Sequence, residues 1–184
     1  SLVGSEMCIR DRGSAYWIGR ELVRRALMCY DGRLSGGELS LRLLLAELGA
    51  DSVIGAVGRL YREYVEPSRV AELAKLACRA AELGCGLARA VIEDAARELE
   101  SMVSAVERRL GFGEGALVYG TGGALLGCRL LAEALRREVE SRRGRRFAVV
   151  DARPVVGCVV HYLASVEGWG AEELERLNIN LPGA

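Results

Sequence analysis

A change in the spacing of apolar residues after Gly115 constrains the fold of this chain more than any other feature. Before it, apolar residues recur every three or four positions, as on the buried face of α-helices. Ser14 and the pair Asp51–Ser52 can cap helices, Pro67 can open one, and Gly111 can close one. The pattern predicts five helices, at about residues 15–30, 38–48, 53–64, 67–83 and 86–110.

After Gly115 the sequence is typical of an α/β unit. The apolar run 116–119 lies between glycines, as expected for a short buried strand. A helix is predicted at about 124–139, a second strand at 147–150 and a last helix at 154–166. We expect parallel strands joined by a right-handed crossover. Two strands do not make a stable sheet by themselves, so further strands are expected outside this sequence.

The charge balance limits the classes of partner. Lys and Arg together number 25, as do Asp and Glu, so the formal net charge at pH 7 is zero. A nucleic-acid-binding surface needs a net basic face, and we interpret the basic run 142–146 as a solvated turn. No apolar stretch reaches the ~18 residues of a membrane span, and the start lacks the pattern of a signal peptide. The sequence therefore predicts a cytoplasmic protein without nucleic-acid or membrane partners.

The cysteines and the single histidine give no indication of a metal site. The cysteines are dispersed, without a C-x-x-C pair or a Cys/His cluster, which excludes the usual zinc spacings. They lie in or beside apolar runs, so we expect buried free thiols. His161 has no identifiable partner and is not expected to act as a general base. The six cysteines are Cys8, Cys29, Cys78, Cys85, Cys128 and Cys158.

The first residues have an unusual origin. The decapeptide Leu2–Asp11 is the translation, codon for codon, of a transposase-end sequencing adapter. We therefore expect residues 1–12 to be an artefact and residues 13–184 to be a fragment of a longer protein. Such a segment is excluded from reasoning about the fold.

Residues 120–123, Gly-Thr-Gly-Gly, form the most informative local motif, and we call them the glycine turn. They lie between a predicted strand and a predicted helix, where glycines let the backbone approach a ligand closely. The motif lacks the Lys-Ser/Thr of a P-loop and the spacing of a dinucleotide fingerprint. On the motif alone, a ligand-binding turn and a tight connection without a ligand both remain open.

A second motif indicates a family. Residues 13–20, Gly-Ser-Ala-Tyr-Trp-Ile-Gly-Arg, resemble the G-S-(A/G)-Y-W-I-G segment of the N-acetylglucosamine kinase family. That family is grouped with the BadF/BadG/BcrA/BcrD-type ATPases, in the superfamily of acetate and sugar kinases, heat-shock chaperones and actin. The resemblance covers about residues 13–167. It includes the segments 80–84, Ala-Ala-Glu-Leu-Gly, and 153–158, Arg-Pro-Val-Val-Gly-Cys, and the glycine pair after a strand.

The resemblance implies an α/β fold: the C-terminal lobe of a two-lobed, ribonuclease-H-like kinase that binds ATP and Mg²⁺ in its cleft. Gly122 and Gly123 match a glycine pair that lies along the adenosine, and Ala81 matches a small residue of the nucleotide pocket. Asp11 falls where the family has a sugar-contacting aspartate, although its codon belongs to the adapter stretch, and Arg12 replaces the family's glutamate. The phosphate loops, metal contacts and catalytic aspartate would lie upstream, so no catalytic or metal-binding residue is expected here.

The expected function is an ATP-dependent kinase of N-acetylglucosamine or a related amino sugar, with the present chain inactive alone. One alternative is an ATPase that activates a dehydratase or reductase through an iron–sulfur cluster, which needs cysteines in a ligand loop. Another is a non-enzymatic regulator with the same fold. The expected partner is a small-molecule amino sugar, and a homodimer is left open.

Overall fold

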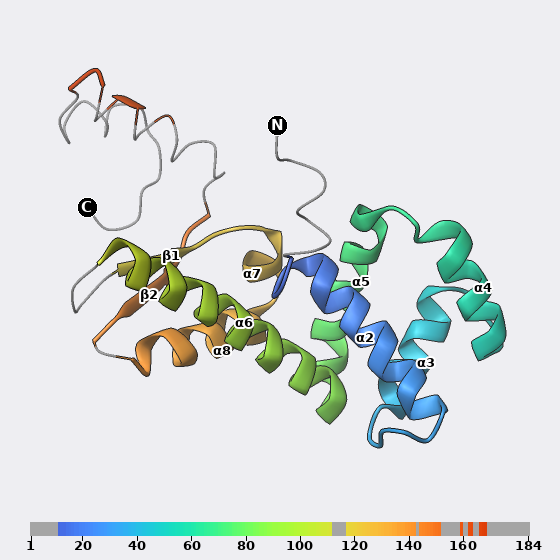
Figure 1. Cartoon of the computed structure of the whole chain (residues 1–184). Helices are drawn as coiled ribbons and strands as arrows, with labels where there is room; N and C mark the ends of the chain where they lie inside the picture. Colours follow the sequence, from blue (N-terminus) through green and yellow to red (C-terminus); the bar gives the residue numbers. More distant parts are fainter. Residues whose placement is uncertain are drawn as a thin grey trace.

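The computed structural model describes residues 11–111, 117–142, 144–151, 159, 162–163 and 166–168. Within them the molecule is mostly helical, with a small parallel sheet at one end (Figure 1). The mostly helical α/β character is as predicted, whereas the ribonuclease-H-like assignment stays a prediction. In chain order the elements are α2 (Ala15–Tyr30), α3 (Glu38–Glu47), α4 (Val53–Glu63), α5 (Pro67–Glu82), α6 (Gly86–Leu110), β1 (Leu117–Gly120), α7 (Gly123–Gly127), α8 (Arg129–Glu140) and β2 (Arg146–Val149).

Local capping chemistry sets the helix boundaries, as the sequence predicted. The backbone N–H of Trp17 donates to the Ser14 hydroxyl (3.1 Å) at the start of α2. Ser52 accepts from the Gly55 backbone N–H in the same way at the start of α4 (3.1 Å). These side-chain oxygens satisfy N–H groups that have no partner within the helix. Gly111 ends α6 in the left-handed conformation, with φ of 67°.

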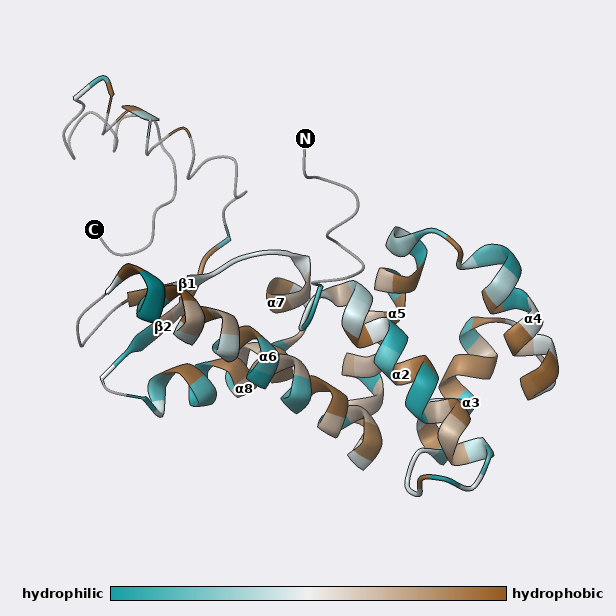
Figure 2. Ribbon diagram, viewed as in Figure 1, coloured by the Kyte–Doolittle hydropathy of each residue, from teal (hydrophilic) through white to brown (hydrophobic). Residues whose placement is uncertain are grey.

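Helices α2, α5 and α6 enclose the core, and α2 lies directly against α5. Gly19 allows the two helices to approach this closely, because a Cβ atom at this position would overlap the Val70 carbonyl oxygen. Hydrophobic and hydrophilic residues alternate along these helices (Figure 2). The fully buried larger side chains here are Ile18, Leu22, Leu73, Val91 and Ile92.

The sheet has two parallel strands, with Leu117 opposite Arg146 and Gly120 opposite Val149. The parallel pairing confirms the prediction, although each strand is displaced by about one residue from the predicted range. The single helix predicted at 124–139 is wrong. The backbone is extended at Cys128, with φ of −132° and ψ of 95°, and this interrupts the helix to give α7 and α8. The last predicted helix, 154–166, lies mostly outside the described residues.

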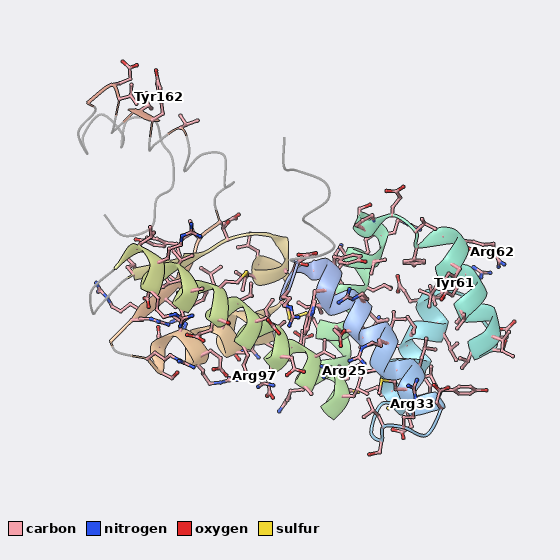
Figure 3. The ribbon with its side chains drawn as sticks, in the orientation of Figure 1. Arg25, Arg33, Tyr61, Arg62, Arg97 and Tyr162 are labelled. Atoms are coloured by element: carbon pink, nitrogen blue, oxygen red, sulfur yellow. A yellow bond between two sulfur atoms is a disulfide. The ribbon has the colours of Figure 1, made fainter. Side chains whose placement is uncertain are left out.

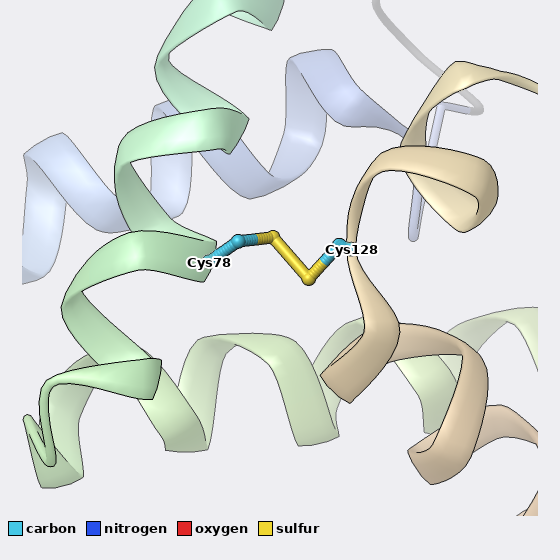
Figure 4. The surroundings of a disulfide bond; sticks show 2 residues. All are labelled: Cys78 and Cys128. Atoms are coloured by element: carbon cyan, nitrogen blue, oxygen red, sulfur yellow. A yellow bond between two sulfur atoms is a disulfide. The ribbon is translucent and has the colours of Figure 1, made fainter.

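A disulfide joins Cys78 on α5 to Cys128 between α7 and α8, with 5.8 Å between their Cα atoms (Figure 4). The prediction that all cysteines are free thiols is therefore wrong for this pair. Cys29 and Cys85 are free, as predicted. The two bonded residues are 50 positions apart, so no local spacing could indicate the pairing. The bond connects the helical part of the chain to the α/β unit.

The turn between α8 and β2 is more than a solvated basic loop. The Arg145 guanidinium donates to Glu100 (2.9 Å) and to Glu107, both on α6. Only 9% of the Arg145 side chain is exposed, so the prediction of a solvated turn is wrong for this residue. Burial favours a higher pKa for Glu100, but the Ser104 hydroxyl and the guanidinium groups of Arg145 and Arg142 outweigh it and lower that pKa. This ion-pair cluster fixes the sheet to α6.

Candidate functional site

The glycine turn lies where both strands end. The strands are parallel, so their carboxyl ends share one edge of the sheet. The backbone N–H of Val150 donates to the Gly120 carbonyl (2.8 Å), which keeps the ends of the two strands together. Ligands of open α/β sheets bind at this edge. The pairing also brings Asp151, which is exposed, to the same edge.

Each glycine of the turn has a different physical role. A Cβ atom on Gly120 would lie 2.7 Å from Phe147 Cζ and 2.9 Å from Leu125 Cδ1, so packing requires glycine there. Gly122 has φ of 109°, a conformation that residues with side chains rarely adopt. A Cβ atom on Gly122 or Gly123 would meet no atom within 4 Å. The backbone of this pair therefore faces open space that a planar ligand could occupy.

Ala81 is connected to this edge through α5. Cys78 and Ala81 are three positions apart, so they lie on the same side of the helix. The disulfide attaches that side of α5 to Cys128, directly after α7. The Ala81 side chain is fully buried. The structure thus places α5 against α7, while a contact between Ala81 and a nucleotide stays a prediction.

Asp11, the residue predicted to contact the sugar, lies a few residues before the start of α2. Burial raises the pKa of its carboxyl group, and the Ser14 hydroxyl and Arg20 offset only part of that effect. The next residues pack on α6: Arg12 pairs with Glu98 (2.9 Å), and a Cβ on Gly13 would lie 2.7 Å from Leu99 Cγ. The sugar-binding role of Asp11 stays a prediction.

Possible metal ligands are not clustered in the described part of the chain. Within residues 11–111, 117–142 and 144–151, no group of three or more His, Cys, Asp or Glu side chains could hold an ion. His161 lies outside the described residues. In the described part of the chain, no helix is both long enough and apolar enough to cross a bilayer.

Comparison with known families decides the identity of the chain. The sequence model of the BadF/BadG/BcrA/BcrD ATPase family matches residues 1–159. The chain belongs to this family. A comparison with curated proteins finds no match.

Membership of the BadF/BadG/BcrA/BcrD ATPase family implies ATP binding and an ATPase or kinase-like function. The matched range includes the glycine turn, β1 and β2, together with all of the helices α2 to α8. It also includes residues 1–12, whose adapter origin stays a prediction. Sequence reasoning did not consider Asp151, which the structure brings to the edge of the sheet that carries the glycine turn. The predicted parallel pairing of the strands could have placed it at the ligand edge.

Proposed function

We propose that this BadF-type ATPase chain supplies the adenosine-binding side of an ATP-dependent kinase that phosphorylates N-acetylglucosamine or a related amino sugar. The observation that carries the proposal is the backbone of Gly122, which combines a φ of 109° with open space in front of it. A ligand can thus contact the backbone directly, at the edge of the sheet where ligands bind. The ribonuclease-H-like lobe implied by the family resemblance is part of this proposal.

The residues of this chain would bind and orient the nucleotide rather than perform chemistry. The adenosine would lie along Gly122 and Gly123, and ATP would supply the phosphoryl group. Asp151, exposed at the same edge, can accept a hydrogen bond from a ribose hydroxyl. In phosphoryl transfer, positioning and electrostatic stabilisation contribute most of the catalysis. The hydrogen bond from Val150 to Gly120, which holds the first residue of the turn to the end of β2, supports such positioning.

The disulfide argues against the iron–sulfur alternative. A cluster needs cysteine thiolates in an accessible ligand loop. The sulfur of Cys128, directly after α7, is bonded to Cys78, and 3% of Cys128 is exposed. Cys85 is also buried, where its sulfur contacts the Ser40 hydroxyl at 3.0 Å. These three sulfur atoms are engaged in contacts within the protein, so none of the three is available as a cluster ligand.

Replacement of Gly122 by valine tests the nucleotide site. The branched side chain would enter the open space and disfavour positive φ, at a backbone cost of ~1–2 kcal/mol. We expect the dissociation constant for ATP, measured by calorimetry on the folded protein, to rise about tenfold or more, equivalent to ~1.4 kcal/mol. A sugar-dependent ADP-release assay on the enzyme containing this lobe tests the kinase reaction itself.

Gly32→Val is the matched control. Gly32 also has positive φ (73°) and open space around a Cβ atom, but it follows α2, far along the chain from the glycine turn. Both variants should lose a similar amount of stability, and only Gly122→Val should lose ATP affinity. Equal ATP affinity in the two variants, within about twofold of the unmodified chain, would remove the glycine turn from the nucleotide site.

A further inference from the structure

The disulfide between Cys78 and Cys128 lies close to the glycine turn along the chain. Cys128 follows α7 directly, and α7 begins at Gly123, directly after its N-cap residue Gly122. Figure 4 shows the bond joining α5 to the junction between α7 and α8. The bond is therefore positioned to fix the direction in which the chain leaves the glycine turn.

The two ends of this bond are held very differently. On one side, seven residues of α5 are buried. This helix packs on α2, where Arg25 (Figure 3) pairs with Asp94 on α6. On the other side, none of the five residues of α7 is fully buried, and so short a helix is not stable by itself. The bond thus attaches a weakly held helix to a firmly packed one.

The sequence of residues 123–140 is also compatible with one continuous helix. Apolar residues recur there every three or four positions, as on one face of a helix. The residues of this face are Ala124, Cys128, Leu131, Leu135 and Val139. Gly127 weakens such a helix without ending it. In the structure, however, the backbone at Cys128 is extended, with φ of −132° and ψ of 95°, at the residue that the disulfide holds to α5.

We propose that the Cys78–Cys128 bond is a reversible redox switch that sets the conformation of the glycine turn. With the bond formed, α7 stays separate from α8 and the backbone of Gly122 faces open space. With the bond reduced, Cys128 adopts helical geometry and α7 aligns with α8. The switch would act on the nucleotide, and this part of the inference rests on the proposed function of the turn.

The change of helix direction must be taken up within the glycine turn itself. Gly120 is held to the end of β2 by the hydrogen bond from Val150 (2.8 Å) and cannot follow α7. Thr121 and Gly122 therefore have to change their backbone angles. The φ of 109° at Gly122, which brings its backbone to the ligand edge, belongs to the oxidised form. Reduction should for this reason weaken ATP binding.

The reductant that the switch requires is a dithiol. One of its thiolates attacks a sulfur of the Cys78–Cys128 bond, forms a mixed disulfide and releases the other cysteine, which takes up a proton. Its second thiolate then attacks the mixed disulfide and releases the remaining cysteine as a thiol. The dithiol is oxidised to a disulfide by loss of two electrons and two protons, and the protein gains both pairs. A low-molecular-weight disulfide reverses the exchange.

Access to the bond also depends on α7. Only 3% of Cys128 and 8% of Cys78 are exposed, so a dithiol reaches the sulfur atoms when the structure opens locally. Segments with few buried contacts have the lowest local stability, and α7 is such a segment. Reduction should therefore proceed under native conditions, without unfolding of α5.

Hydrogen exchange of the whole chain, with and without a dithiol, tests the conformational change. Arg129 and Leu130 begin α8 in the oxidised chain, so their amides have no carbonyl partner within that helix. In a continuous helix these amides donate to the carbonyls of Leu125 and Leu126. We expect reduction to slow their exchange about tenfold or more. Loss of a cross-link alone would leave their exchange unchanged or speed it.

Calorimetry with ATP tests the effect on the nucleotide. We expect the dissociation constant to rise about fivefold or more on reduction, because the fraction of binding-competent chains falls. Cys78→Ala leaves the sequence of residues 123–140 unchanged, and it should show the weaker affinity without reductant and no response to it. Cys29→Ala is the matched control, since it removes a free cysteine on α2 and should keep the full response. The reduced unmodified chain gives the same measurement if Cys78→Ala does not fold.

The two measurements separate failure of the switch from failure of the proposed function. Unchanged or faster exchange at Arg129 and Leu130, in a chain whose reduction is verified by thiol labelling, would overturn the switch. Slowed exchange with an ATP affinity that stays within about twofold would overturn it equally, since the turn would not respond. If neither form binds ATP, the proposed function fails, and the exchange result alone decides whether the bond controls the helix.

Discussion

Replacing Gly19 by alanine should show that the glycine of the Tyr-Trp-Ile-Gly segment serves helix packing. In the middle of an exposed helix, a glycine-to-alanine change stabilises a protein by ~1 kcal/mol, because alanine has the higher helix propensity. At Gly19 the new Cβ would overlap the Val70 carbonyl oxygen and lie 3.2 Å from Leu73 Cβ. Backbone oxygen cannot rotate away as a side chain can, so α2 and α5 must separate.

The expected loss follows from this overlap. Overpacking a close-packed core costs ~1–3 kcal/mol, and more where backbone must move. We expect Gly19→Ala to lower the free energy of unfolding by at least ~2 kcal/mol after the gain in propensity. For a chain of this size that corresponds to a fall in Tm of ~4–8 °C. Thermal and urea unfolding followed by circular dichroism measure both quantities.

Gly58→Ala provides the comparison, since Gly58 lies in α4 and the atom nearest to a new Cβ is the mobile Arg62 Nη1 at 3.4 Å. It should stabilise the protein slightly, by ~0.5–1 kcal/mol. If Gly19→Ala proves as stable as Gly58→Ala, the close approach of α2 to α5 is not a constraint and the packing argument fails.

Other predictions concern the ion pairs and the disulfide. Arg145→Met should lower the free energy of unfolding by ~1.5–3 kcal/mol, because it removes the guanidinium that pairs with Glu100 and Glu107, while Arg142 still pairs with Glu100. Arg129→Met, at an exposed pair, should change it by less than ~1 kcal/mol in urea unfolding. The lowered pKa of Glu100 stabilises the fold above the ordinary carboxyl pKa of 4.5. That contribution to the free energy of unfolding should disappear as the pH falls through the lower, folded-state pKa. In unfolding curves measured at a series of pH values, Glu100→Gln should therefore make the free energy of unfolding fall less steeply with decreasing pH. Cys78→Ser should cost ~2–4 kcal/mol by loss of a long cross-link, while non-reducing peptide mapping should recover Cys78 and Cys128 in one cross-linked peptide. A melting curve unchanged by reductant would contradict a formed disulfide.

The sequence predicted most of the helical structure because the relevant interactions are local. Ser14 and Ser52 act on backbone groups three positions away, and Gly111 ends α6 through its own φ. The interruption at Cys128 was not predictable in this way. Gly127, directly before Cys128, weakens the helix but does not by itself end it. The extended backbone occurs where the disulfide joins Cys128 to α5.

The candidate site was predicted in part. A glycine turn between a strand and a helix is visible in the sequence, because both the period change and the glycines are local signals. The need for glycine at position 120 comes from the side chains of Phe147 and Leu125 and was not visible in the sequence. The open space in front of Gly122 and Gly123 is also seen only in the folded chain. Asp151 joins the edge only through strand pairing.

Composition, capping residues and the period of apolar positions thus determined the fold class, the helix boundaries and the position of the glycine turn. The tertiary structure alone decided which apolar faces are covered. The stripe on α6 looks uniform in the sequence, yet Val91 is fully buried while Val106 is 52% exposed. It likewise decided that Arg145 is buried and that Cys78 meets Cys128. The physical reason is distance along the chain: capping acts within one helical turn, whereas burial, ion pairing and disulfide formation depend on residues that only folding brings together.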